Sequence, residues 1–520
     1  MNQQQQNSID ANDVLLQAGA DELAKQYQQH QESKSQDHQH KANQQQDQPN
    51  TTSMLDKLLT FMPEIDFELR LREETAEQHL ASYINKGGNI KIPNRLYSVL
   101  IIEELLHIAN QHNIDICRHY DENVKIPYIF NGKYWEVIGG NRLKDFLTQC
   151  AIKSGYMKLE SKTPTFQNLL NETFWCNSTF QKINKDSINT TLVNLNNYTL
   201  EINEHGVEAK PHNKEHFLLY KLDFDYNINA TAPQFQQYLE QVLPDKQSQR
   251  LLQEVIGYVF TKHLKLEKCA ILFGSGSNGK SVFFDIMMAL LGTDNVTNFS
   301  LKHLAEEHNR AMLDGKLLNY GSEINSGIDN DIFKQLASGE PVQARHKYGH
   351  SFTIHNYARL VFNANELPRA TEHTTAYFRR FLLVHFDQVI DSNNADQALA
   401  KKIINTELAG VMNWVIDGVK RLQHNKKFSY CAKSEELLAS YKKDSDVVAL
   451  FLEDGNYQPS INNHKPLLQE IYKDFRIFCS ENGYCIMANK TFTKRLRELG
   501  YNVKRGTGHK SIVEIVRVSN

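Results

Sequence analysis

The sequence predicts an α/β fold for the centre of the chain, with a mixed α+β and helical domain before it and a small basic domain after it. KCAILFG (268–274) has the apolar pattern of a buried strand, a Gly/Ser-rich loop follows it, and KSVFFDIMMALLG (280–292) has helical periodicity. Short apolar runs then alternate with polar connectors over residues 316–386, which is typical of an α/β core.

The length of 520 residues suggests three or four units, because one domain commonly takes about 100–200 residues. Composition and local patterns divide the chain into six parts. The parts are a Gln-rich tail (1–52), an N-terminal α+β domain (53–190), a strand and helical region (191–265), the α/β core (266–390), a helical region (391–455) and a winged-helix-like basic domain (456–520). The tail has too few apolar groups to offset its ordering entropy, so we expect disorder there. Its apolar island, Val14–Ala24, is compatible with one short helix that either docks on a partner or forms only transiently.

Local patterns predict elements on both sides of the core. Helical periodicity marks residues 95–112, 232–262 and 397–445. Residues 126–138 predict a hairpin around Asn131-Gly132, because Asn-Gly between two apolar runs is a strong hairpin signal. Residues 190–226 look strand-rich, with a second turn at Asn196-Asn197. Residues 455–466 are rich in turn-forming residues and are interpreted as a linker.

Composition and charge limit the classes of protein to which this chain can belong. The formal net charge of −3 does not exclude nucleic-acid binding, since the distribution of charge matters more than its sum. The seven cysteines are scattered without zinc-type spacing, so we expect reduced thiols that are nearly all buried. The N-terminus is polar, and no apolar run approaches the ~18 residues that span a bilayer. We therefore expect a soluble protein of a bacterial or host cytoplasm, without membrane contact.

The most specific motif is GSGSNGKS, which matches the phosphate-loop pattern GxxxxGK[ST] completely. Its members are Gly274, Ser275, Gly276, Ser277, Asn278, Gly279, Lys280 and Ser281. Glycines let the backbone wrap a phosphate group, and the following helix offers its positive N-terminus to the same anion. Lys280 would contact the terminal phosphates and Ser281 would bind Mg²⁺, so ATP with Mg²⁺ is the expected cofactor. The alternative is a simple Gly-rich turn.

Polar residues follow two later apolar runs, at the places where a hydrolase needs them. In KLLNYGSEI (316–324) an apolar run ends in Glu323, whose carboxylate could activate water and contribute to the metal site. In ARLVFNANEL (358–367) an apolar run ends in Asn363 and Asn365, and the Asn365 amide could sense the γ-phosphate. Arg379 and Arg380 follow a Thr-rich loop and could stabilise a neighbour's γ-phosphate. Taken singly, these features are also compatible with a solvated strand end, a turn and a surface charge pair.

The order of these motifs resembles the superfamily-three helicases of the AAA+ class, and more closely the phage/plasmid primase–helicase family, which includes the poxvirus-type proteins. TLVNLNNYTLEI (191–202) and LLQEVIGYVFTKHL (251–264) resemble the region before that family's motor, and ELAGVMNWVIDGVKRL (407–422) resembles the helix after it. The resemblance covers about residues 100–520. It implies an AAA+ phosphate-loop core and a hexameric ring with ATP sites between subunits.

Carried over by motif, the resemblance implies that Lys280 and Ser281 bind Mg-ATP and that Glu323 activates water. Asn365 would be the sensor, and either Arg379 or Arg380 the arginine finger. One departure concerns the metal site. Ser322 stands where many such hydrolases have an Asp, so Mg²⁺ would depend on Ser281, water and the Ser322 hydroxyl.

Two basic segments are candidates for DNA binding. PVQARHKYGHSFTIHN (341–356) predicts a hairpin with Arg345, Lys347 and His350 at its tip, and the resemblance implies that such a hairpin enters the ring channel. Phosphate neutralisation would let it follow single-stranded DNA without reading bases. The alternative is an exposed charged hairpin.

The C-terminal segment predicts a helix, NKTFTKRLRELG (489–500), followed by a Gly-turned hairpin with a basic tip. Its proposed DNA contacts are Lys494, Arg497, Lys504 and Arg505. A helix followed by a basic wing indicates a winged-helix domain, which binds either DNA or a protein partner.

These patterns favour an ATP-dependent replicative DNA helicase of a phage, plasmid or other mobile element. The expected partners are single-stranded or forked DNA, further copies of the chain, and a primase or another replication protein. The alternative is an ATP-switched replication initiator or loader without processive unwinding. Primase activity is not expected, because Asp223 and Asp225 form a D-x-D pair that no S/T-x-H motif follows before the phosphate loop.

Overall fold

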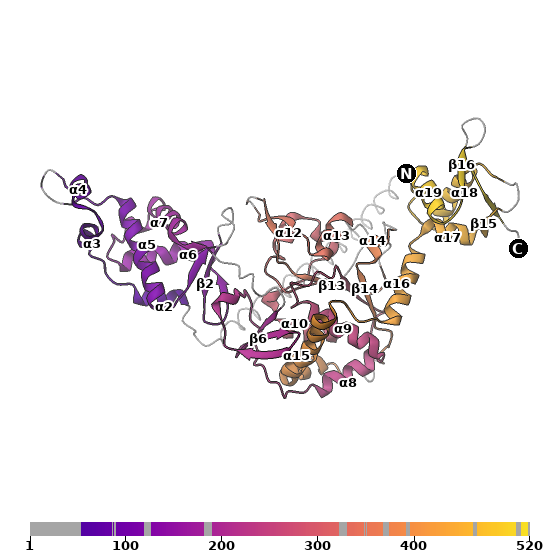
Figure 1. The fold of residues 1–520 in the computed structure, drawn as a ribbon, viewed down its shortest axis with the longest axis horizontal. Helices are drawn as coiled ribbons and strands as arrows, with labels where there is room; N and C mark the ends of the chain where they lie inside the picture. The colour runs from indigo at the N-terminus through magenta and orange to yellow at the C-terminus, as the bar shows by residue number, and fades with distance from the viewer. Residues whose placement is uncertain are drawn as a thin grey trace, which may run out of the picture.

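The computed structural model shows an elongated molecule. The N-terminal unit and the C-terminal unit lie on either side of a central sheet (Figure 1). The structure describes residues 54–517 except 86, 88–89, 119–125, 181–189, 322–329, 348, 350, 368–373, 392–395, 461–464 and 506–510. The Gln-rich tail and its apolar island therefore lie outside the described residues, and so do Glu323 and His350.

The N-terminal unit packs helices around a small mixed sheet. Its helices are α2 (Met54–Phe61), α3 (Phe67–Glu74), α4 (Glu77–Leu80), α5 (Asn94–Gln111), α6 (Gly140–Lys153) and α7 (Pro164–Asn177). Its strands, in the order β3-β2-β1-β4, are β1 (Ile116–Arg118), β2 (Pro127–Phe130), β3 (Trp135–Val137) and β4 (Thr179–Phe180). The hairpin predicted around Asn131-Gly132 is confirmed: Tyr128 pairs with Val137, and Gly132 has a φ of 91°.

The next region contains an antiparallel sheet and two helices. They are β5 (Thr191–Asn194), β6 (Thr199–Asn203), β7 (Gly206–Lys210), α8 (Pro233–Val242) and α9 (Lys246–Tyr258). The turn predicted at Asn196-Asn197 is confirmed, because Asn194 pairs with Thr199 across it. The strand-rich prediction is wrong for residues 211–226, which contain no strand. Asn194 fixes this segment instead: its side chain donates to the Tyr220 carbonyl at 2.9 Å, and its carbonyl accepts from the Leu222 N–H at 2.9 Å.

A five-stranded, fully parallel sheet lies at the centre, in the order β14-β8-β13-β10-β9. Its strands are β8 (Cys269–Phe273), β9 (Val296–Thr297), β10 (Leu318–Gly321), β13 (Arg359–Ala364) and β14 (Phe381–His385). The helices of this region are α10 (Lys280–Leu291), α11 (Leu301–Leu304), α12 (Glu307–Ala311), α13 (Asn330–Ser338) and α14 (Thr375–Phe378). The prediction of an α/β core is confirmed. Every residue of β8 is buried, as expected for a parallel strand covered on both faces.

Alternate side chains of β8 enter two different cores. Ala270 and Leu272 pack in a core that also includes residues of β5, β6, α8, α9, α10 and α15 (Leu399–Asn425). Cys269 and Ile271 pack on the other face, with α13, α14 and the hairpin of β11 (Val342–Arg345) and β12 (Ser351–Ile354). The region before the sheet and the long helix after it thus share one continuous core with the sheet. Short 3₁₀ helices are η1 (Ala81–Tyr83), η2 (Glu160–Lys162), η4 (Lys214–His216) and η5 (Thr293–Asn295).

After α15, α16 (Ala432–Asp444) leads to a C-terminal unit with its own core (Figure 1). The unit contains α17 (Val447–Asp454), β15 (Tyr457–Pro459), α18 (Leu468–Glu481), α19 (Asn489–Glu498), β16 (Val503–Arg505), β17 (Ser511–Val513) and β18 (Ile515–Arg517). The linker interpretation of residues 455–466 is wrong for β15, which pairs with β18. The reason is tertiary, because Tyr457 is buried in the core and pairs with Arg517, which lies far along the sequence.

Two further expectations from the sequence concern the burial of the cysteines and the absence of a membrane-spanning segment. Five of the seven cysteines are buried, but Cys176 and Cys485 are exposed, so the expectation that nearly all would be buried is only partly met. All seven are free thiols. Among the described residues, none of the helices combines the length and apolarity that crossing a membrane requires.

Candidate nucleotide site and nucleic-acid surfaces

The phosphate-loop motif lies between the carboxyl end of β8 and the start of α10, where the sequence predicts it. Gly276, Ser277 and Gly279 have positive φ values of 101°, 49° and 83°. Left-handed residues in such a turn allow backbone N–H groups to face an anion. A Cβ on Gly276 would meet no atom within 4 Å, so the loop is open at this residue.

The outer side of the loop is closely packed. A Cβ on Gly274 would collide with the carbonyl of Phe386, which follows β14. A Cβ on Gly279 would lie 2.6 Å from Cγ1 of Val242 on α8. The Asn278 amide also donates to the Phe386 carbonyl at 3.0 Å. These contacts explain why the loop needs glycine at positions 274 and 279, and they hold its backbone from outside.

Lys280 is the first residue of α10, and its side chain is only 7% exposed. Its ammonium donates to the Gly274 carbonyl at 2.7 Å and to Oδ1 of Asn278 at 2.9 Å, so it lies across the loop. Burial lowers the pKa of Lys280 below its ordinary value. An anion beside it would offset that desolvation. Ser281 is exposed at the same helix N-terminus.

The strands bring the predicted sensor to the same edge of the sheet as the loop. The Gly274 N–H donates to the carbonyl of Ala364, the last residue of β13, at 3.2 Å. Asn365 follows directly and is exposed. Asn363 accepts a hydrogen bond from the Tyr320 hydroxyl at 3.0 Å, so this asparagine joins β13 to β10. Glu323 comes two positions after the last residue of β10 but lies outside the described residues.

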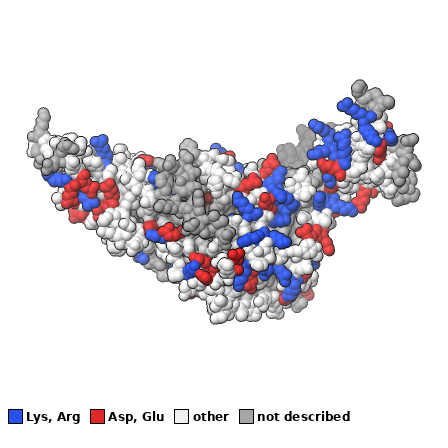
Figure 2. All heavy atoms as spheres, in the orientation of Figure 1, with Lys and Arg blue, Asp and Glu red and all other residues white. Residues whose placement is uncertain are grey.

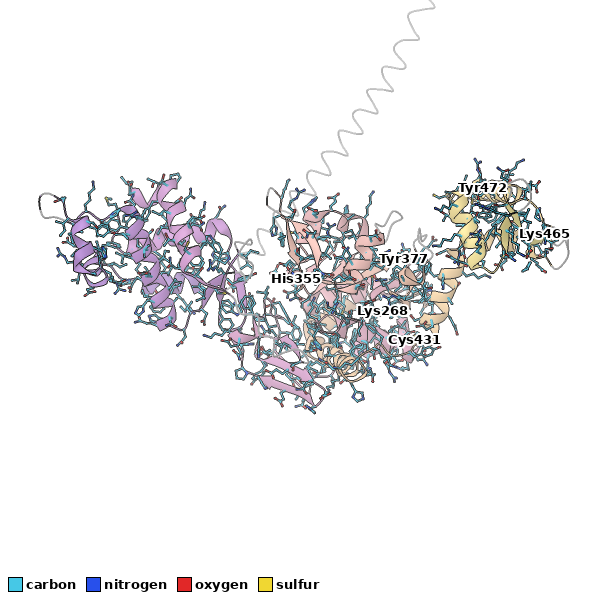
Figure 3. All side chains as sticks on the ribbon, turned by 45° about the horizontal axis from the view of Figure 1, so that its top comes forward. Lys268, His355, Tyr377, Cys431, Lys465 and Tyr472 are labelled. Atoms are coloured by element: carbon cyan, nitrogen blue, oxygen red, sulfur yellow. The ribbon has the colours of Figure 1, made fainter. Side chains whose placement is uncertain are left out.

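The two arginines have different environments. Arg380 is 7% exposed, and its guanidinium donates to the Ser338 hydroxyl at 2.9 Å and to the Ala376 carbonyl. Arg379 is exposed and contacts Glu267 at 2.5 Å. Lys268, which Figure 3 labels on the central body, donates to the Arg379 carbonyl at 2.6 Å. Arg379 therefore lies where β8 begins, at the amino-terminal end of the parallel strands. The phosphate loop lies at their carboxyl end.

The predicted basic hairpin forms from β11 and β12, which pair antiparallel with Arg345 opposite Ser351. Arg345 and Lys347 are exposed, and Nε of Arg345 lies 3.5 Å from a carboxylate oxygen of Glu307. His350 lies outside the described residues. The hairpin thus carries exposed positive charge, partly balanced at its base by one acid.

Lysine and arginine side chains gather on the C-terminal unit in Figure 2. Lys494 and Arg497 are exposed on α19, Arg505 is exposed on β16, and Lys504 contacts Glu514 at 2.9 Å. Arg495, by contrast, contacts the buried Asp446 at 2.6 Å and holds α19 on α17. A hollow of about 440 Å³ beside α19 is lined by Leu467, Leu468, Gln469, Asn489, Lys490, Thr493, Arg497 and Ser511.

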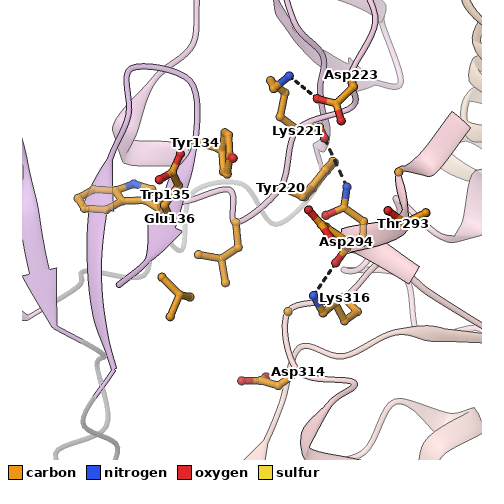
Figure 4. A pocket seen from close by; sticks show the side chains of 15 residues that line it. Tyr134, Trp135, Glu136, Tyr220, Lys221, Asp223, Thr293, Asp294, Asp314 and Lys316 are labelled. Carbon is orange, nitrogen blue, oxygen red and sulfur yellow. Dashed lines mark hydrogen bonds and ion pairs between the residues drawn. The ribbon is translucent and has the colours of Figure 1, made fainter. Parts of the chain in front are cut away.

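A second hollow, of about 350 Å³, lies between the β2–β3 hairpin and the amino-terminal side of β10 (Figure 4). Its lining includes Tyr134 and Trp135 on one side and Asp294, Asp314 and Lys316 on the other. Burial raises the pKa of Asp314 to about 6. This hollow is remote from the phosphate loop, since Asp314 and Lys316 precede β10 while the loop follows β8.

The D-x-D pair is not brought into a metal-type cluster. Asp223 is exposed and contacts Lys221 at 2.6 Å, whereas Asp225 accepts a hydrogen bond from Asn196 at 2.9 Å. Among the described residues, no group of three or more His, Cys, Asp or Glu side chains is arranged to hold a metal ion.

Sequence reasoning missed Tyr238, which lies on α8. Its hydroxyl donates to the Gly279 carbonyl at 2.9 Å, across 41 positions of the sequence. Local patterns give no signal for such a contact. The apolar face of α8, which includes Tyr238 and Val242, indicated only a buried helix face.

Parts of this chain are similar to two protein families and to solved structures. Residues 109–244 match a family model described as "D5 N terminal like", and residues 272–380 match one described as "Family of unknown function (DUF5906)". Two solved structures titled as A form apo structures of the NrS-1 C-terminal region are similar. One is 14% identical with a TM-score of 0.44 and covers 80% of this chain and 98% of that chain. The other is 11% identical with a TM-score of 0.47 and covers 81% and 99%. The chain is thus similar to D5-type proteins in the region before the phosphate loop, and to the second family over the loop and the sheet.

Proposed function

We propose that this chain is an ATP-hydrolysing motor that moves DNA, acting as the replicative helicase of a phage, plasmid or other mobile element. The carrying observation is the phosphate loop itself, with a buried Lys280 across it and the end of β13 hydrogen-bonded to its first glycine. This arrangement favours a nucleoside triphosphate at the carboxyl edge of the sheet.

The strand order supports an AAA+ assignment for the core. β13 is inserted between β8, which precedes the phosphate loop, and β10, which precedes Glu323. The resemblance of the motifs to superfamily-three helicases implies this insertion, because the sensor strand must lie beside the loop. The D5 N terminal-like match directly upstream supports the phage primase–helicase family.

The residues present fit Mg-ATP. The loop is open at Gly276 and held from outside at Gly274 and Gly279, and its lysine is already desolvated. Lys280 would neutralise the terminal phosphates, and Ser281 would offer its hydroxyl to Mg²⁺, which would supply charge neutralisation there. In the same proposal Glu323 orients water and contributes to the metal site.

Asn365 completes the proposed catalytic set as the sensor. It is exposed and follows Ala364, whose carbonyl accepts from the loop's first N–H. Its amide would hydrogen-bond the γ-phosphate and report hydrolysis to β13, and through the Asn363–Tyr320 hydrogen bond to β10.

The position of Arg379 supports the proposal of a ring. The five residues of β8 span about 16 Å, and Arg379 lies at the end away from the loop. Arg379 therefore suits a γ-phosphate bound by the adjacent subunit, while the buried hydrogen bonds of Arg380 suit a structural role. We assign the arginine finger to Arg379 and infer a closed ring of identical subunits, a hexamer by resemblance.

DNA would pass through the ring. The β11–β12 hairpin presents Arg345 and Lys347, and His350 would add to them. The order α17–β15–α18–α19–β16–β17 in the C-terminal unit favours a winged helix. Its exposed Lys494, Arg497 and Arg505, with Lys504, suit a phosphate backbone.

The decisive experiment measures ATP hydrolysis and strand displacement by the full chain on forked DNA. We expect DNA-stimulated hydrolysis and displacement, both abolished by Lys280→Ala but retained by Lys302→Ala, which changes an exposed lysine on α11. Hydrolysis that survives Lys280→Ala would refute the assigned loop. Slow hydrolysis with DNA loading but no displacement would instead identify an ATP-switched initiator or loader, the second candidate.

A further inference from the structure

Helix α8 lies outside the phosphate-loop motif but contacts its last glycine at two points. The Tyr238 hydroxyl donates to the Gly279 carbonyl at 2.9 Å, and Val242, one helical turn later, leaves no room for a Cβ on Gly279. Tyr238 is 2% exposed, so its hydroxyl is shielded from water. The contact is therefore a partly buried hydrogen bond to the loop backbone, combined with steric support from the same helix face.

Helix α8 is itself held in place from the far side. Both carboxylate oxygens of Glu407 on α15 accept hydrogen bonds from the first turn of α8: from the Gln234 N–H at 3.1 Å and from the Phe235 N–H at 3.0 Å. Glu407 is 5% exposed. A buried carboxylate at a helix N-terminus is favourable for both groups, so α8 has a fixed position relative to the core.

The geometry of one peptide links this support to anion binding. The Gly279 carbonyl and the Lys280 N–H belong to one planar trans peptide and point in opposite directions. The carbonyl also accepts the helical hydrogen bond from the Phe283 N–H at 3.2 Å, which is longer than the bond from Tyr238. Because Gly279 is in the left-handed region, the helix alone constrains this peptide less than an interior one.

We propose that Tyr238 is a positioning residue of the nucleotide site, which fixes the Gly279–Lys280 peptide so that the Lys280 N–H faces the bound phosphate. This inference rests on the proposed function, since it takes the loop to bind a nucleoside triphosphate. It makes the region before the sheet a part of the nucleotide site. That region cannot then be removed or exchanged without changing nucleotide affinity.

The test is Tyr238→Phe in the full chain, which keeps the ring and removes only the hydroxyl. The matched control is Tyr220→Phe: the Tyr220 hydroxyl is also buried in the same core and donates to a backbone carbonyl, that of Leu192, at 2.9 Å. Binding of ADP and of a non-hydrolysable ATP analogue is measured by calorimetry, and thermal unfolding is recorded for each variant.

We expect Tyr238→Phe to weaken binding of both nucleotides about three- to tenfold, the loss of one net hydrogen bond, while Tyr220→Phe leaves it unchanged. Unchanged affinity in Tyr238→Phe, or equal losses in both variants, would overturn the inference while leaving the proposed function intact. If the wild-type chain binds neither nucleotide, the proposed function fails, and the inference with it.

Val242→Ala provides a second variant if Tyr238→Phe does not fold. Removing Cγ1 and Cγ2 of Val242 takes away the steric support behind Gly279 without touching a polar group. We expect a smaller loss of affinity in the same direction, with KM for ATP raised more than kcat is lowered. A variant that folds and binds nucleotide with wild-type affinity would contradict the proposed role of α8.

Discussion

The guanidinium of Arg379 contacts the carboxylate of Glu267 at 2.5 Å, at the edge of the central sheet where β8 begins. Lys268 donates a hydrogen bond to the Arg379 carbonyl, and the Cys269 N–H donates to the Arg380 carbonyl at 2.7 Å. The three consecutive residues 267–269 thus fix the position of the two arginines. The same strand leads into the phosphate loop at its other end. The proposed arginine finger and the phosphate-loop motif thus lie at opposite ends of one short buried strand.

This separation predicts complementation between two inactive variants. Lys280→Ala chains keep Arg379, and Arg379→Ala chains keep the phosphate loop. If sites form between subunits, random mixing at equal amounts should complete about a quarter of them and restore a corresponding part of the ATPase activity. Steady-state ATP hydrolysis of the mixture, compared with each variant alone, is the measurement. An inactive mixture that still forms rings would argue against a shared site.

Glu323→Gln should trap ATP without hydrolysing it, because the amide cannot orient water as the carboxylate does. When mixed with wild-type chains, this variant should reduce strand displacement more steeply than its share of the mixture, since one stalled site stops a coordinated ring. Displacement rates at several mixing ratios give the curve. A straight line would mean that the sites act independently.

Lys347→Ala should weaken single-stranded DNA binding and lower the salt dependence of log Kd by about one, because one phosphate contact is lost. Basal ATPase should be unchanged. The control is Lys401→Ala, which removes an exposed lysine on α15, far along the chain from the hairpin. Fluorescence anisotropy at several salt concentrations measures the slope, and equal slopes for the two variants would exclude the hairpin tip as a contact.

Arg497→Ala and Arg495→Ala should have different effects on DNA binding and on stability, although both residues lie on α19. Arg497 is exposed, so its loss should weaken DNA binding by the C-terminal unit with little effect on unfolding. Arg495 pairs with the buried Asp446, so its loss should mainly destabilise the unit, by about 3 kcal/mol. DNA affinity and thermal unfolding of both variants separate these effects. Full DNA affinity in a folded Arg497→Ala would favour a protein-docking role.

Asp314 predicts a pH-dependent stability. Burial raises its pKa from 3.8 to about 6, so the folded state holds this proton more tightly than the unfolded state does. Its favourable contribution is complete below about pH 4 and is lost as pH rises through about 6. Asp314→Asn should therefore be more stable than wild type at pH 8, by about 3 kcal/mol, and the advantage should vanish near pH 4. Urea unfolding at both pH values measures it, and an equal difference at both would show that the carboxyl is not responsible.

Several elements could be predicted from sequence because their signals are local. The phosphate loop needs glycine and lysine at fixed spacing, and the hairpin at residues 126–138 needs Asn131-Gly132 between two apolar runs. Helix α10 and strand β8 follow from apolar periodicity alone. The strand pattern overestimated strand over residues 211–226, which contain the 3₁₀ helix η4 and are held by isolated hydrogen bonds, such as those of Asn194 with the Tyr220 carbonyl and the Leu222 N–H, in place of a strand ladder.

The sequence by itself determined which side chains are available for chemistry, since it places a lysine, a serine and a set of glycines at the spacing that phosphate loops use. Only the tertiary structure distinguished Arg379 from Arg380, which are adjacent in sequence but exposed and buried, respectively. It alone also joined Tyr238 to Gly279, and Tyr457 to the end of the chain. The physical reason is that burial and long-range hydrogen bonds depend on contacts between distant segments, which no local pattern encodes.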